Sequence, residues 1–146
     1  MPKMETAAIR SKLRLARIAR LATVDSSNRP HVVPICFAYD KSVIYTAVDR
    51  KPKRVSAKKL ARMRNIRANP QVTVLVDRYT ENWKRLWYIQ VRGRARLVPE
   101  SAKAERARAL RLLRAKYAQY TKQMLPDDAP IIRITTEQIF AWGISD

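Results

Sequence analysis

The chain has 146 residues, and its 31 Lys and Arg against 12 Asp and Glu give a formal net charge of +19. An apolar content of 47% is enough for the core of one domain and excludes a disordered basic tail. A single cysteine, Cys36, and a single histidine, His31, exclude an internal disulfide framework, a Cys-rich zinc module and a His-cluster metal site. The sequence shows no membrane-spanning run and no signal-peptide core, so we expect one cytoplasmic domain over residues 1–146.

The first half of the chain predicts a helix, three strands and a second, basic helix. Ile9, Leu13 and Ala16 recur at helical spacing within the N-terminal segment. Pro34 cannot donate a backbone hydrogen bond, which places its strand at a sheet edge or a bulge. The predicted elements are an N-terminal helix within residues 1–19, strands at 21–25, 31–39 and 42–48, and a helix at 53–68.

The second half predicts two strands, a helix capped by Ser101, and a closing strand. Gly93 marks a bulge or a close backbone approach within a long strand, in which Trp87 faces the core. Six antiparallel strands with helices at the crossovers favour a mainly β fold, a small β-barrel with covering helices. The predicted elements are strands at 71–77 and 86–98, a helix at 102–119 and a strand at 131–142.

Positive charge is concentrated in the middle of the chain. Residues 41–70 hold ten basic residues against Asp49 alone, and this density between two apolar strands predicts an anion site. Asp49, Asp77 and Glu81 are scattered, which argues against hydrolysis by a carboxylate pair, and we interpret them as surface or turn residues. Cys36 lies in an apolar run and is interpreted as a core thiol, not a nucleophile.

Two features leave alternatives open. The aromatic residues Tyr79, Trp83, Trp87 and Tyr88 lie beside basic ones, either as core and dimer interface or as a stacking wall for a flat ring. The net charge of +19 also suits a nucleic-acid-binding barrel. Because no RNP-like stretch, helix-turn-helix spacing or zinc finger is present, nucleic acid is not the expected partner.

Several segments, in order, resemble the pyridoxamine 5′-phosphate oxidase-like flavin and deazaflavin split barrels. They span residues 20–143 and imply a six-stranded antiparallel split β-barrel that binds FMN or F420. The segments are Arg20–Asp25, Arg29–Pro34 with Phe37 and Tyr39, Tyr45–Lys53, Arg64–Val72, Val91–Leu97 and Ile139–Gly143.

Two further segments, Asp49–Lys53 and Asp77–Trp87, resemble the branch of F420-dependent enzymes. This resemblance implies a homodimer with cofactor sites at the subunit interface, and an oxidoreductase that transfers hydride from reduced F420 to an unidentified small molecule. The ring carries out such chemistry, so no catalytic side chain is expected. The phosphate and glutamate tail of F420 suit the basic segment, FMN is the alternative cofactor, and a tetrapyrrole substrate is conceivable within such barrels.

By motif position, the resemblance also implies which residues bind the cofactor. One strand is expected to run beside the ring, and a basic segment with one hydroxyl donor is expected to hold the phosphate. Arg62 competes with Lys53 for the phosphate, and Trp83, Arg85, Trp87 or Trp142 is expected to reach the cofactor from the partner subunit. These residues are Pro30, His31, Val32, Val33 and Pro34 for the ring, Thr46, Lys51, Lys53, Arg54 and Arg62 for the phosphate, and Trp83 and Trp87 from the partner.

Overall fold

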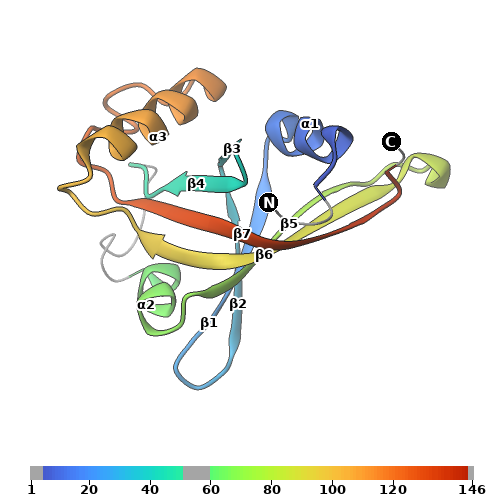
Figure 1. The fold of residues 1–146 in the computed structure, drawn as a ribbon, viewed down its shortest axis with the longest axis horizontal. Coiled ribbons are helices and arrows are strands. Elements are labelled where there is room, and N and C mark those ends of the chain that lie inside the picture. Colours follow the sequence, from blue (N-terminus) through green and yellow to red (C-terminus); the bar gives the residue numbers. More distant parts are fainter. Residues whose placement is uncertain (1–4, 51–59, 145–146) are drawn as a thin grey trace.

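In the computed structural model, which describes residues 5–50 and 60–144, the chain forms a curled seven-stranded antiparallel sheet (Figure 1). The strand order is β2-β1-β5-β6-β7-β4-β3. This half-barrel confirms the predicted mainly β fold of the split-barrel type. The strands are β1 (Ala19–Val24), β2 (Pro30–Ile35), β3 (Ala38–Asp40), β4 (Val43–Ala47), β5 (Gln71–Arg78), β6 (Trp87–Leu97) and β7 (Ile131–Trp142).

The described residues hold seven strands where six were predicted, because the segment 31–39 is divided. Its first part, β2, pairs with β1, whereas its last part, β3, pairs with β4. Between them Cys36 and Phe37 carry the chain from one edge of the sheet to the other. The predicted edge position of Pro34 is confirmed, since β2 is an outermost strand.

The described residues also form three α-helices and one short 3-10 helix. In α1 (Ala7–Leu15) the Thr6 hydroxyl accepts a hydrogen bond from the Ile9 amide at 3.2 Å and caps the N-terminus. The described part of the predicted helix 53–68 is α2 (Ala61–Ala68), and residues 51–59, with Lys51, Lys53 and Arg54, lie outside the described residues. The others are η2 (Trp83–Arg85) and α3 (Lys103–Lys116). None of the described helices is long and apolar enough to cross a membrane.

The predicted cap of α3 is wrong. Its N-cap is Ala102, not Ser101, and no side chain caps it. Instead, Glu105 in the first turn attaches α3 to the sheet. Its carboxylate accepts from the Tyr45 hydroxyl at 2.8 Å and pairs with Arg133 and Arg96.

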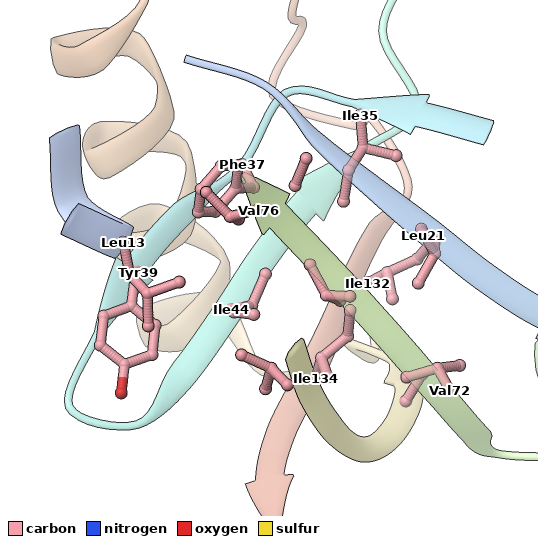
Figure 2. Packing of buried hydrophobic residues seen from close by; sticks show 14 of the residues in the cluster. Leu13, Leu21, Ile35, Phe37, Tyr39, Ile44, Val72, Val76, Ile132 and Ile134 are labelled. Carbon is pink, nitrogen blue, oxygen red and sulfur yellow. The ribbon is translucent and has the colours of Figure 1, made fainter. Parts of the chain in front are cut away.

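The two faces of the sheet have different environments. The inner face carries the main core, in which Leu13 of α1 meets side chains from all seven strands (Figure 2). Met63 of α2 belongs to the same cluster. α3 covers the outer face only near β3, β4 and β7, where Leu110 and Leu113 are buried. The rest of the outer face, on β2, β1, β5, β6 and the end of β7, has no covering element among the described residues.

Gly93 shows why β6 needs a glycine at this point. The β6–β7 register shifts between Arg92 and Gly93, so the predicted bulge is confirmed, and Glu137 of β7 is the extra residue. A Cβ atom at Gly93 would collide with the backbone carbonyl oxygen of Thr135 and lie 3.0 Å from the Ile134 side chain.

We therefore expect Gly93→Ala to lower the free energy of unfolding by about 1–3 kcal/mol through overpacking. Urea unfolding followed by circular dichroism measures this. Arg94→Ala, at the next, exposed position of β6, is the control and should stay within about 0.5 kcal/mol of the parent. Equal stability of the Gly93→Ala variant and the parent would contradict this account of the bulge.

Candidate functional site

The strand predicted to contact the cofactor ring has an open edge. Among the described residues β2 pairs only with β1, so alternate backbone N–H and C=O groups point away from the sheet. Pro30, Val32 and Pro34 lie on the outer face, and the Val32 side chain is 60% exposed. His31 and Val33 are half-buried on the inner face. A flat ring with polar atoms on its edge could bind along this strand.

His31 is held next to α2. It pairs across the ladder with Thr23, whose hydroxyl accepts a hydrogen bond from the Asn65 amide at 2.9 Å. The Nδ1 atom of His31 is buried and has no hydrogen-bond partner in the part of the chain that the structure describes. The imidazole therefore carries an unsatisfied polar atom at the strand where the cofactor is expected.

Thr46 of β4 contacts the crossing, the segment Cys36–Phe37 in which the chain passes from one edge of the sheet to the other. Its hydroxyl is buried and donates to the Cys36 carbonyl oxygen at 2.7 Å. This bond uses the one proton of the hydroxyl, so Thr46 can donate to a phosphate only if the bond opens. In the described structure Thr46 fixes β4 to the segment that follows β2.

Asp49 is a buried residue, which corrects its interpretation as a surface or turn carboxylate. Its side chain is 8% exposed and accepts a hydrogen bond from the Tyr120 hydroxyl at 2.6 Å. The amides of Val48 and Arg50 donate to the carbonyls of Pro130 at 2.9 Å and Met124 at 2.8 Å. The start of the basic segment is thus anchored by the connection between α3 and β7.

Arg62 lies near this pair, at the start of α2. Burial lowers the pKa of its guanidinium, while the electrostatic effects of Asp49 and Tyr120 act in the opposite direction. Burial and the hydrogen bond to Asp49 raise the pKa of the Tyr120 phenol, which therefore remains a donor. Thr46 and Arg62, two predicted phosphate ligands, are thus both connected to the crossing, Thr46 through Cys36 and Arg62 through Asp49 and Tyr120.

Cys36 is at the boundary of the core. It is half-buried against the cluster formed by α3, and it lies close enough to Tyr120 and Lys116 to affect the pKa of each. The interpretation as a core thiol is therefore only partly right. Among the described residues no group of three His, Cys, Asp or Glu could hold a metal ion.

Trp83 and Trp87 are not brought to this crossing. Trp83, in η2, is 70% exposed, and Trp87 opens β6 with the Lys12 ammonium 4.8 Å from the centre of its ring. Both are at the end of β5 and β6 opposite α2 (Figure 1). A role for them in the same cofactor site would require the second subunit that the resemblance implied.

The outer face carries an apolar patch that sequence analysis covered only in part. By register, the patch residues Val32, Tyr88, Phe140 and Trp142 share this face, and each is substantially exposed. The Tyr88 and Trp142 rings stack with their centres 6.1 Å apart. Beside the patch, a groove of about 420 Å³ is lined by apolar and polar side chains, among them Ala22, Val24, Pro30, Thr73, Arg92 and Gln138.

Comparison with known proteins identifies the family. Residues 5–143 match the pyridoxamine 5′-phosphate oxidase family. The chain belongs to the pyridoxamine 5′-phosphate oxidase family. No curated protein matches the chain in sequence.

Solved structures related to this oxidase family carry different ligands in their names. The chain is similar to an FAD-binding protein from Mesorhizobium loti, with 26% identity, a TM-score of 0.67 and coverage of 94% of each chain. It is similar to an F420 reductase, with 25% identity, a TM-score of 0.66 and coverage of 96% of this chain and 98% of that one. HutZ, the heme storage protein from Vibrio cholerae, shares the fold at 18% identity, with a TM-score of 0.70 and coverage of 90% of each chain.

Tyr120 is a residue that sequence analysis missed in this member of the oxidase family. Tyr120→Phe should lower the free energy of unfolding by about 1–3 kcal/mol, because it removes a donor from the buried carboxylate of Asp49. Urea unfolding measures the loss.

Tyr79→Phe is the matched control, since the Tyr79 ring is 65% exposed and its hydroxyl makes a 3.4 Å contact with Glu81. We expect a change within about 0.5 kcal/mol for this variant. If both phenylalanine variants lose the same stability, the buried Asp49–Tyr120 bond is not what anchors this segment.

Proposed function

We propose that this member of the pyridoxamine 5′-phosphate oxidase family binds F420 along the open edge of β2 and is an F420-dependent oxidoreductase. The observation that carries the proposal is the half-buried Arg62 of α2, close to Asp49 at the anchored start of the basic segment. The same helix reaches the open-edged strand β2 through the Asn65–Thr23 bond and the Thr23–His31 pair. When bound, F420 supplies two-electron hydride chemistry for reducing a small molecule. The similarity to an F420 reductase supports this choice.

In this proposal the residues of the chain bind the cofactor and orient its ring. The backbone of β2 offers donors and acceptors to the polar edge of the ring, and Arg62 offers a cation to the phosphate. The sequence places Lys51, Lys53 and Arg54 next to the anchored residue Arg50. A cofactor with more negative charge than one phosphate suits this basic density, which favours F420 over a flavin.

A flavin is the second candidate, because the chain is 26% identical to an FAD-binding protein over most of both chains. FMN has one phosphate and no acidic tail, so the two cofactors are distinguished by how strongly basic residues contribute to affinity. For a tetrapyrrole ligand the support is the fold that the chain shares with the heme storage protein HutZ. A nucleic-acid-binding barrel rests on net charge, and gel shifts at rising salt test it separately, since non-specific binding weakens steeply.

Fluorescence titration with F420 and with FMN tests the cofactor. We expect a Kd for F420 well below about 100 μM and weaker binding of FMN. Clearly tighter FMN binding, or no F420 binding at that concentration, would contradict the proposal. A substrate screen with reduced F420 then tests turnover.

Arg62→Gln should weaken F420 binding about tenfold, because a half-buried cation near the phosphate is lost. Arg64→Gln is the matched control, an exposed arginine of the same helix. If Arg62→Gln binds like the parent while the double variant Lys51→Glu, Lys53→Glu binds poorly, the lysines of the basic segment hold the phosphate instead of Arg62.

We further propose that the apolar patch pairs two copies of the chain, which would bring the Trp83 end of one subunit toward the site of the other. Exposed aromatic residues on an uncovered sheet face are typical of subunit interfaces. Phe140→Arg should convert a dimer to a monomer in sedimentation velocity. Leu15→Arg, at an exposed apolar residue of α1 away from this face, should not. A monomeric parent protein would overturn the pairing.

A further inference from the structure

Lys116, the last residue of α3, has a buried ammonium that finds no hydrogen-bond partner among the described residues. The Nζ atom is 3.9 Å from the centre of the Phe37 ring and 5.4 Å from that of Tyr117. Ring faces attract a cation, but they do not replace the hydrogen bonds that an ammonium makes in water. This leaves the Lys116 ammonium poorly compensated.

Arg17, in the link between α1 and β1, places a second cation against the Tyr117 ring. Its guanidinium carbon is 4.7 Å from the centre of the Tyr117 ring, and its backbone carbonyl accepts from the Tyr117 hydroxyl at 3.0 Å. Burial and then the positive charge of Arg17 lower the pKa of Lys116 to about 8. Among the described residues no carboxylate pairs with either cation, and the other titratable side chains beside Lys116 are Cys36 and Tyr117.

Two neighbouring cations without a counter-ion repel each other, and burial of one of them increases the cost. An anion placed between them would remove this repulsion and supply the missing hydrogen-bond acceptors. The tightly held Tyr117, which hydrogen-bonds both to Arg17 and to Phe37, keeps the two cations together.

We propose that Arg17 and Lys116 form a binding site for one anionic group, a carboxylate or a phosphate, of a small-molecule ligand. The site lies where the link between α1 and β1, the crossing at Phe37 and the end of α3 meet. It does not depend on the identity of the cofactor.

The test follows the Lys116 side chain by NMR in protein labelled at the lysine ε-carbon, with Lys116→Arg to assign the signal. Inorganic phosphate and glutarate are titrated in parallel at constant ionic strength set with sodium chloride. A bound anion favours the charged ammonium, so the pKa of Lys116 should rise by about 1 unit with the anion that fits. Which of the two gives the larger rise distinguishes phosphate from carboxylate.

Arg17→Gln should raise the pKa of Lys116 in the free protein, since one positive charge is removed, and should abolish the response to either anion. Arg17→Lys, which keeps the charge, should retain most of the response. Arg14→Gln, at an exposed arginine one turn earlier in α1, should behave as the parent. An unchanged Lys116 titration with both anions, or a full response in Arg17→Gln, would overturn the site.

Discussion

The arrangement of the strands in this protein depends on the hydrogen bonds that the Tyr117 hydroxyl makes. The hydroxyl accepts a hydrogen bond from the Phe37 amide at 3.0 Å, and the carbonyls of Arg17 and Phe37 lie 3.0 and 3.2 Å away as acceptors. The chain passes at Phe37 from one edge of the sheet to the other, where no strand partner can satisfy its buried backbone groups. One side chain from α3 does so instead.

The same crossing accounts for the character of the candidate site. At the crossing the chain passes from β2, at one edge of the sheet, to β3, at the other edge. The outer edge of β2 therefore has no strand partner among the described residues, and Cys36 stays half-buried between the two groups of strands. Burial lowers the pKa of both Arg62 and Lys116. The protein thus holds cations in positions where they are poorly solvated, a condition that an anionic ligand relieves.

Elements with strong local signals could be predicted from the sequence. The alternation of Val72, Val74 and Val76 indicates β5, and Pro34 indicates an edge strand. The break at Cys36 and Phe37 could not be predicted, since the apolar pattern continues through it while the pairing partner changes.

The site is less predictable for a similar reason. Asp49 is buried because of Tyr120, a residue 71 positions away that no local pattern connects to it. Thr46 was singled out by motif position, but only the folded chain shows that its proton is already donated to Cys36. Arg17 and Lys116 likewise come from segments that are remote in the sequence, yet they are close enough for one to affect the pKa of the other. The composition therefore predicts the net charge but not where these cations lie.

The place of β7 in the sheet has a consequence for how the protein folds. β7 is the last strand of the described chain, yet it lies between β6 and β4 and joins the group β2-β1-β5-β6 to the β3–β4 hairpin. On the ribosome these two groups cannot form one sheet until β7 has emerged. Contacts of such large sequence separation slow folding, so the nascent chain holds two incomplete half-sheets with unpaired edges for most of its synthesis.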